Sequence, residues 1–143
     1  MFIGEYQYNL DDKNRLMVPA KFRAKLGKGA VVTRGLDNCL FIYPQAEWLK
    51  LSGKISDLPI GQAKSRAFAR LMLSGAMEVE FDGQGRITLP EYLKKFAGLK
   101  KAVVMAGLMN RLEIWDEAKW RKYQTETERD STDIAENLGS LGV

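Results

Sequence analysis

An internal duplication constrains this chain of 143 residues more than any other feature of its sequence. The segment Asp82–Arg86 repeats the pattern of Asp11–Arg15, and the two copies stay aligned at a shift of 71 and then 72 residues. The aligned pairs include Gly4 with Gly75, Pro19 with Pro90, Gly27 with Gly98, Leu40 with Leu112, Ile42 with Ile114 and Trp48 with Trp120. Matched glycine, proline, aliphatic and tryptophan residues preserve a backbone and a core. No core requires the matched aspartate and arginine, so they are the first candidates for function.

Each copy predicts the same order of elements, ββαββ, which gives an α+β fold with a mainly β core and short helices. A unit of about 45 residues buries too little apolar surface to fold alone, so the two copies are expected to complete one core. The first copy reads as strands Glu5–Leu10, Arg15–Val18, Ala30–Thr33 and Leu40–Tyr43, with a helix from Pro19 to Gly27. The second reads as strands Met77–Phe81, Arg86–Leu89, Ala102–Ala106 and Arg111–Trp115, with a helix from Pro90 to Gly98. Each proline suits the first helical position, and each glycine suits a helix end.

The remaining segments complete the predicted organisation. We expect the first repeat at 5–48, a helical connector at 49–75, the second repeat at 76–120, and an acidic C-terminal helix or tail at 121–143. Two helices are predicted between Pro44 and Ser74, and they are separated by the turn-forming residues around Asp57–Gly61. Trp48 and Trp120 follow the last strand of each copy, and we expect both to pack.

Composition and charge narrow the class of protein. The chain is 45% hydrophobic and 28% charged, which is an ordinary balance for a soluble globular protein. Residues 1–120 carry a net charge of +6 and residues 121–143 a net charge of −2. A basic body favours a polyanionic partner such as nucleic acid, although many proteins share such a charge for solubility alone. No apolar run approaches the roughly 20 residues of a membrane span, no signal peptide is apparent, and Cys39 is the single cysteine. These features predict an intracellular protein without a membrane partner.

The paired loops carry the strongest functional signal. Each predicted hairpin loop begins with an aspartate and ends with an arginine, and its fourth residue, Asn14 or Gly85, is of a type that accepts positive φ. One interpretation is a structural clasp worth about 0–1 kcal/mol at a surface. The other is that the aspartate orients the guanidinium toward a phosphate or a guanine edge in DNA. Recurrence at equivalent points favours the second interpretation, with DNA-binding residues Asp11, Lys13, Asn14, Arg15, Asp82, Gln84 and Arg86.

Other residues receive simpler interpretations. The lysines and arginines after the prolines are read mainly as solvated helix faces, with some phosphate contacts; they are Lys21, Arg23, Lys25, Lys28, Lys94, Lys95, Lys100 and Lys101. The absence of histidine excludes a Ser-His or Cys-His nucleophile pair and a histidine-based metal site. Cys39 is expected to be a small buried hydrophobe. Asp11, Asp12 and Asp82 could hold Mg²⁺, but the adjacent cations compete with that use. We therefore expect no enzyme activity, cofactor, metal or small-molecule substrate.

With these residues in place, the sequence closely resembles the MraZ family, bacterial proteins related to the AbrB-type swapped-hairpin transcription factors. The resemblance spans nearly the whole chain. It is carried by Met1–Tyr6, Asp11–Arg15, Val18–Arg23, Thr33–Asp37, Tyr43-Pro44 with Glu47-Trp48, Phe81–Arg86 and Asn110–Trp115. Each motif is weak alone, and their order and spacing make the resemblance specific. One position departs from the usual pattern: Asn14 stands where the family commonly has glycine.

The resemblance implies a fold and a function. Two tandem AbrB-like repeats would interleave into one pseudo-symmetric swapped-hairpin barrel, and protomers would assemble into homo-oligomeric rings. The loops ending in Arg15 and Arg86 would bind double-stranded DNA at short direct repeats upstream of the division and cell-wall gene cluster. Such a regulator would be cytoplasmic and nucleoid-associated. Asn14 accepts the left-handed conformation, so the turn should survive, but its side chain could alter base preference.

Three hypotheses follow for the function. The leading one is a sequence-specific transcriptional regulator that acts as a repressor by occupying promoter repeats. The second is a ring-forming protein-interaction module whose basic loops serve only solubility. The third, and weakest, is an enzyme that uses the loop carboxylates with a metal.

Overall fold

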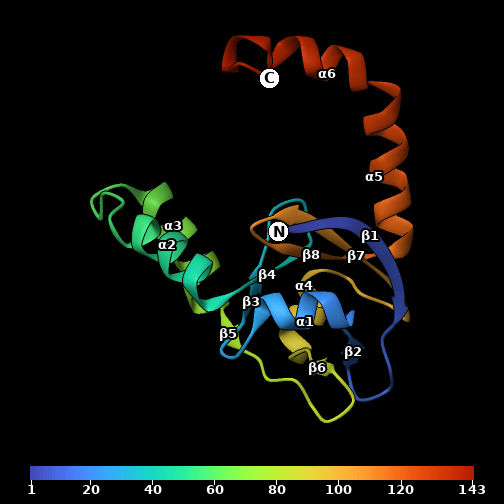
Figure 1. The fold of residues 1–143 in the computed structure, drawn as a ribbon. Coiled ribbons are helices and arrows are strands. Elements are labelled where there is room, and N and C mark those ends of the chain that lie inside the picture. The colour runs from blue at the N-terminus through green and yellow to red at the C-terminus, as the bar shows by residue number, and fades with distance from the viewer.

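The computed structural model describes residues 1–143 as an α+β protein built on antiparallel strands (Figure 1). The first copy contains β1 (Phe2–Asn9), β2 (Arg15–Met17), α1 (Ala20–Leu26), β3 (Val31–Arg34) and β4 (Leu40–Tyr43). The connector contains α2 (Gln45–Ser56) and α3 (Ala63–Ser74). The second copy contains β5 (Met77–Glu78), β6 (Arg86–Thr88), α4 (Glu91–Phe96), β7 (Ala102–Met109) and β8 (Leu112–Asp116). The chain ends with α5 (Glu117–Arg129), α6 (Ser131–Asn137) and a 3₁₀ turn, η1 (Gly139–Leu141). None of these helices is long and apolar enough to cross a lipid bilayer.

The two copies interleave within one sheet, which confirms the predicted fold class and tandem repeat. The six-stranded sheet has the order β1-β7-β8-β4-β3-β5, so strands of the first copy alternate in blocks with strands of the second. A separate two-stranded ribbon pairs β2 with β6, again one strand from each copy. Because strands of each copy pair with strands of the other copy, neither copy could form this sheet alone.

The strand register is nearly symmetric between the copies. In the ribbon, Arg15 lies opposite Thr88 while its counterpart Arg86 lies opposite Met17. At the centre of the large sheet, Leu40 lies opposite Ile114 and Ile42 lies opposite Leu112, which is the same exchange. Such reciprocal pairing places a pseudo-twofold axis through both antiparallel pairs. The molecule therefore has the arrangement of a dimer within a single chain.

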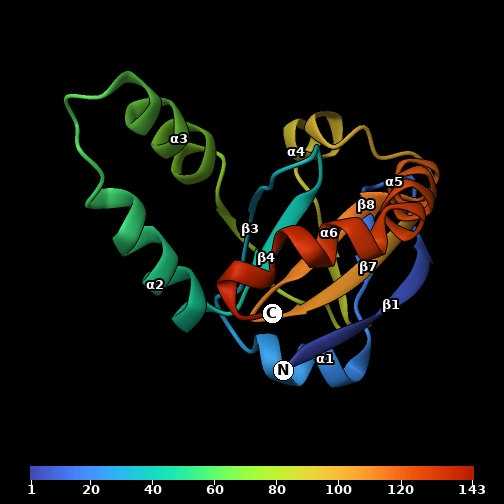
Figure 2. The same cartoon turned by 90° about the horizontal axis from the view of Figure 1, so that it is seen from above.

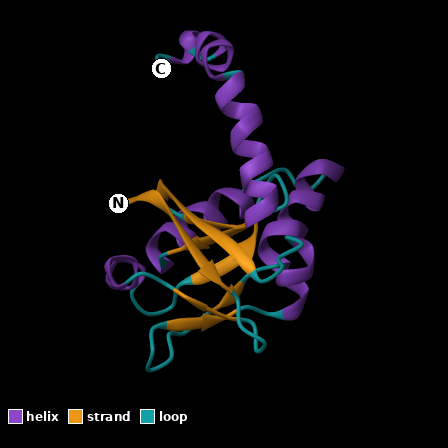
Figure 3. Cartoon of the chain, turned by 90° about the vertical axis from the view of Figure 1, so that its right-hand side faces the viewer, coloured by secondary structure: helices purple, strands orange, loops and turns teal.

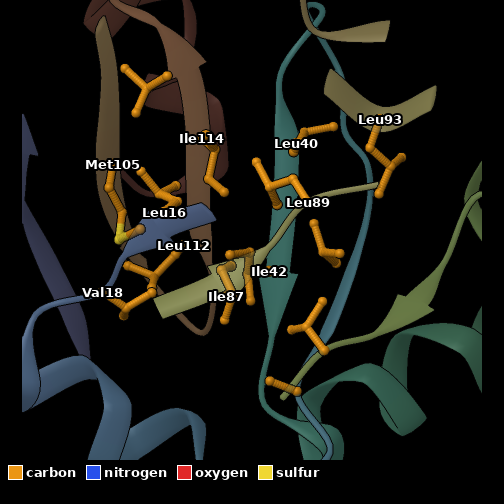
Figure 4. Packing of buried hydrophobic residues seen from close by; sticks show 14 of the residues in the cluster. Leu16, Val18, Leu40, Ile42, Ile87, Leu89, Leu93, Met105, Leu112 and Ile114 are labelled. Carbon is orange, nitrogen blue, oxygen red and sulfur yellow. The ribbon is translucent and has the colours of Figure 1, made fainter. Parts of the chain in front are cut away.

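The main hydrophobic core lies between the ribbon, the large sheet and the two short helices (Figure 4). Leu16 and Ile87 project into it from the ribbon and are 0% and 1% exposed. Phe22 of α1 and Leu93 of α4 enter from equivalent helices. Burial of each such side chain stabilises the fold by about 1.5–3 kcal/mol. The ribbon is thus held in place by side chains on one of its faces, which leaves the other face to solvent.

A second, smaller core fixes the longer helices to the opposite side of the sheet. It is formed by six buried residues: Cys39, Phe41, Tyr43, Ile55, Met72 and Trp115. Both Trp48 and Trp120 pack against it. This confirms the packing role predicted for the two tryptophans. Cys39 is fully buried, and burial raises the pKa of its thiol, as expected of an unreactive hydrophobe. Beyond this core, α2 and α3 extend to one side, whereas α5 and α6 rise from another (Figures 1 and 2).

Several local predictions need correction. The strand predicted over residues 77–81 is reduced to the two residues of β5, which pair with Val31 and Val32 of β3. β1 instead pairs along its full length with the long strand β7. Pro19 and Pro90 do not occupy the first helical position: each is the residue before it, with ψ of 140° and 146°. The proposed division of the chain into repeats and connector stays a prediction, although α2 and α3 do lie within residues 45–74.

Candidate nucleic-acid interface

Two arginines share the solvent-facing side of the β2–β6 ribbon. Side chains alternate between the faces of a strand, and the paired residues Leu16 and Ile87 point into the core. Arg15 and Arg86, one position earlier in each strand, therefore point to the other face. The loops that precede them, Asp11–Arg15 and Asp82–Arg86, lie together at the end of the molecule opposite α6 (Figures 1 and 3).

In the first loop, the carboxylate of Asp11 organises both the turn and the arginine. Its Oδ1 accepts the backbone N–H groups of Lys13 at 2.9 Å and Arg15 at 2.8 Å. Its Oδ2 accepts the Nε–H of Arg15 at 2.6 Å. The backbone N–H of Asn14 donates to the carbonyl oxygen of Asp11 at 3.0 Å and closes the turn. The side chain of Arg15 is thereby held through Nε, and both of its Nη groups stay without a hydrogen-bond partner in the chain.

The second loop repeats this geometry. Oδ1 of Asp82 accepts the backbone N–H groups of Gln84 at 2.9 Å and Arg86 at 3.0 Å, and its Oδ2 accepts the Nε–H of Arg86 at 2.8 Å. The backbone N–H of Gly85 donates to the carbonyl oxygen of Asp82 at 3.0 Å. We call each such unit an Asp–Arg clasp. The loops also cross-link the copies, because Val18 donates its N–H to the carbonyl of Gly85, and Leu89 donates to that of Asn14.

Both clasp aspartates are held in the charged form. The pKa of Asp11 lies below its ordinary value of 3.8, first because the backbone N–H of Arg15 donates to it, and its hydrogen bond with the Arg15 side chain adds to the effect. The pKa of Asp82 is lowered in the same way, first by the backbone N–H of Arg86. Asp82 is exposed and Asp11 is partly exposed, so the clasp orients the guanidinium more than it stabilises the fold.

The surroundings of the two clasps differ. Nη1 of Arg86 lies 3.9 Å from Oδ2 of Asp11, so it reaches the carboxylate of the other loop. Asn14 has φ of 60°, as predicted, but its side-chain amide donates to Oε2 of Glu91 at 2.8 Å. Gly85 has φ of 79° and lies under the guanidinium of Arg23. The first loop is therefore hydrogen-bonded to α4, and the second loop lies against a side chain of α1, each time a helix of the other copy.

Basic side chains flank the first loop. A hollow of about 270 Å³ lies beside it and is lined by Leu10, Asp11, Asp12, Lys94, Lys100 and Lys101. In the equivalent place next to the second loop, a larger hollow includes Arg23 and Lys28 together with two glutamates, Glu78 and Glu80. Cationic charge is therefore denser beside the first loop than beside the second.

The sequence predicts the two clasps, but it does not predict two side chains that lie against the loops, Glu91 and Arg23. Lys13 and Gln84 lie at the exposed tips, and each contributes its backbone N–H to a clasp, with no side-chain hydrogen bond in the chain. Glu91 was not predicted as part of the site, and only its acidity at a helix start could have indicated it. Arg23 was read as part of a solvated face, yet it donates to the carbonyl of Val18 at 2.7 Å. Arg23 therefore has a structural role: it holds the backbone at Val18, and its guanidinium lies against Gly85 of the second loop.

Comparison with known proteins identifies the family of this chain. The family model described as "MraZ protein, putative antitoxin-like" matches it twice, over residues 1–71 and 72–140. The chain is 51% identical over 143 residues to the transcriptional regulator MraZ of Natranaerobius thermophilus, covering all of both chains. It is 48% identical to the proteins of the same name from Halothermothrix orenii, over the whole of both chains, and from Desulforamulus reducens, over 99% of each. With both repeats matched and relatives aligned end to end, the chain belongs to the MraZ family of transcriptional regulators.

Proposed function

We propose that this protein reads double-stranded DNA through its two Asp–Arg clasps and represses transcription by occupying a promoter. The proposed targets are short direct repeats upstream of the division and cell-wall gene cluster to which its own gene belongs, which makes it a nucleoid-associated protein. The residues proposed to contact or position DNA are Asp11, Lys13, Asn14, Arg15, Asp82, Gln84 and Arg86. No cofactor, metal or small-molecule substrate enters this mechanism.

One observation carries the proposal: two arginines, each fixed through Nε, share one face of a two-stranded ribbon. The major groove of B-DNA admits such a ribbon, and guanine presents two acceptors there that match the two Nη donors of an arginine. Because each guanidinium is already oriented by its aspartate, less side-chain freedom is lost on binding. The clasp thus orients the arginine through Nε, and the Nη donors that would hydrogen-bond to a base edge stay available.

Neighbouring groups are suited to the DNA backbone. Lys94, Lys100 and Lys101 beside the first loop can neutralise phosphates on one flank of the groove. Lys13 and Gln84 at the loop tips have free side chains that reach either phosphates or bases. We assign Asn14 a smaller part in base reading than the two arginines, because its amide nitrogen already donates to Glu91. Specificity is therefore assigned mainly to Arg15 and Arg86.

Self-assembly would multiply the affinity of single clasped sites. We propose that several copies join in a ring, so that successive copies engage successive repeats in the promoter. Linked weak sites gain through effective concentration, and avidity can exceed single-site affinity by about 10²–10⁴. Repression would then depend on the number and spacing of repeats.

A second candidate function is a ring-forming interaction module that does not read sequence. It is favoured by the helices that extend from the body (Figure 3). On this alternative, DNA association reflects only the basic body and the release of counterions.

Fluorescence-anisotropy binding separates the two candidates. The protein is titrated against labelled DNA from upstream of its own gene and against a scrambled duplex, each at two salt concentrations. A specific-to-scrambled affinity ratio of about 10³ or more is expected of a sequence-reading regulator. A ratio near one with a steep salt dependence would reject sequence reading and leave the interaction module.

A further inference from the structure

Two helical projections of this molecule carry opposite charge. The first, which we call the basic arm, is the α2–α3 hairpin: residues 45–75 contain five Lys or Arg and two Asp or Glu, a net charge of +3. The second, the acidic arm, is the end of α5 with α6 and η1: residues 124–143 contain one Arg and five Asp or Glu, a net charge of −4. Figure 1 shows the arms separated, on different sides of the body.

The acidic arm displays apolar side chains that nothing in its own chain covers. Ile134 lies in α6, Leu138 directly follows it and Leu141 lies in η1, at spacings of four and three residues, which are typical of residues that share one side of a helical segment. We call these three residues the stripe. They are 40%, 39% and 75% exposed, and all residues from 131 to 143 are exposed to solvent. A helix of seven residues is marginal in water without packing. The arm therefore needs a partner to stabilise it.

The basic arm contains a hollow that fits such a face. About 290 Å³ in volume, it lies near the connection between α2 and α3, and its lining residues are Ile55, Ser56, Leu58, Ile60, Ser65, Arg66, Ala69 and Arg70. Leu58 and Ile60 are 40% and 83% exposed. The lining is apolar and hydroxylic, except for two arginines. It thus offers apolar contact to the stripe and positive charge to the acidic arm that carries the stripe.

We propose that the acidic arm of one copy docks into the hollow on the basic arm of a second copy. This inference rests on the self-assembly within the proposed function, and it names the contacting surfaces. Because the two surfaces are different, the contact is heterologous: each copy gives its acidic arm to one neighbour and receives that of another. The clasped loops lie at the end of the molecule opposite α6 (Figure 3), so docking leaves them exposed to DNA.

The apolar part of the contact is tested with Ile134→Asp in the full-length protein. Thr132→Asp is the matched control, because it adds the same charge to the same helix about 200° around its axis, away from the stripe. Sedimentation velocity over a concentration series should show that Ile134→Asp raises the concentration of half-assembly by about tenfold or more. Thr132→Asp should assemble like the unaltered protein. Equal assembly of the two variants, or an unaltered protein that stays monomeric, would overturn the proposal.

A charge exchange tests which surfaces meet. One variant carries Asp133→Lys and Glu136→Lys, and a second carries Arg66→Glu and Arg70→Glu. Each should assemble poorly alone, whereas a chain carrying all four substitutions should assemble again, because α6, which then carries two lysines, meets a hollow that carries two glutamates. If the fourfold variant assembles no better than either twofold variant, the two surfaces do not meet, and that result would overturn the heterologous arrangement.

Different results would contradict the assembly proposal and the DNA-reading proposal. On a duplex with a single repeat, Ile134→Asp should bind as the unaltered protein does; on a duplex with several repeats, its affinity should fall by about 10²-fold or more as avidity is lost. Normal assembly of Ile134→Asp would overturn arm docking even if DNA is read. A specific-to-scrambled ratio near one for a fully assembled protein would overturn DNA reading and leave arm docking intact.

Discussion

The two loops share their Asp–Arg clasp and differ in what surrounds it. In both, one carboxylate accepts two backbone N–H groups and the Nε–H of the arginine four residues later. The fourth residue is Asn14 in one loop and Gly85 in the other. Asn14 is bonded to Glu91, whereas Gly85 lies under Arg23. The repeated part is the part that orients an arginine.

This difference shows which residues the clasp itself requires and which residues differ only in its surroundings. The turn needs a residue at positive φ in its fourth position, and both asparagine and glycine supply one. Only the first loop adds a side-chain amide there, together with three lysines nearby. We therefore expect equivalent roles for the two arginines and unequal roles for the surrounding residues.

The largest expected effect comes from removing both arginines. Arg15→Ala with Arg86→Ala should bring the specific-to-scrambled DNA affinity ratio from about 10³ or more to near one, since only phosphate contacts remain. Anisotropy competition at fixed salt measures it, and a circular-dichroism melt checks the fold. The matched pair Arg15→Lys and Arg86→Lys keeps the charge but loses the planar fork. Full specificity in the lysine variant would show that charge, and not the clasped geometry, reads the DNA.

A second effect concerns stability and should differ between the loops. Gly85→Ala places a Cβ at positive φ and close to the guanidinium of Arg23, so the free energy of unfolding should fall by about 1–3 kcal/mol. Asn14→Gly keeps a permissive backbone and loses one exposed hydrogen bond, so the decrease should be under about 1 kcal/mol. Urea denaturation measures both. Equal losses would contradict the different packing of the two fourth residues.

A smaller effect should separate the loops in base preference. Glu91→Ala frees the amide of Asn14, which can then hydrogen-bond to a base, so binding to operators altered at one position should change by severalfold. The equivalent residue of the first copy, Ala20, offers no such partner to the second loop. Affinities for a set of single-base operator variants measure the change. An unaltered preference pattern would mean that Asn14 stays away from the bases.

The smallest effect is the response of the clasps to pH. The pKa values of Asp11 and Asp82 are lower in the folded protein than their ordinary value of 3.8, so each carboxylate favours folding above that value. This contribution decreases only as pH falls below 3.8 through the folded pKa. Carboxyl ¹³C chemical shifts should therefore show both residues titrating below 3.8. Titration of either one at 3.8 or above would contradict its clasp.

Individual residues show which parts of the structure could be predicted from the sequence. The matched Asp11–Arg15 and Asp82–Arg86 segments predict both loops, and the local geometry agrees because an aspartate that accepts N–H groups two and four residues ahead is a short-range feature. Paired strands such as β4 were predicted for the same reason, from local apolar patterns. The contacts of Glu91 with Asn14 and of Arg23 with Gly85 escaped prediction, because these residues lie far apart in the chain and meet only through the interleaving of the copies.

The sequence by itself determined the duplication, the ββαββ order, the two turns and the aspartate and arginine in each. These depend on neighbours within a few residues, where φ preferences and side-chain reach decide the outcome. Only the tertiary structure decided that β2 and β6 form one ribbon with both arginines on its outer face, and that Arg86 approaches the carboxylate of Asp11. It also decided that the acidic and basic arms lie apart in one chain (Figure 1). These arrangements follow from how two incomplete cores close on each other, which no local pattern encodes.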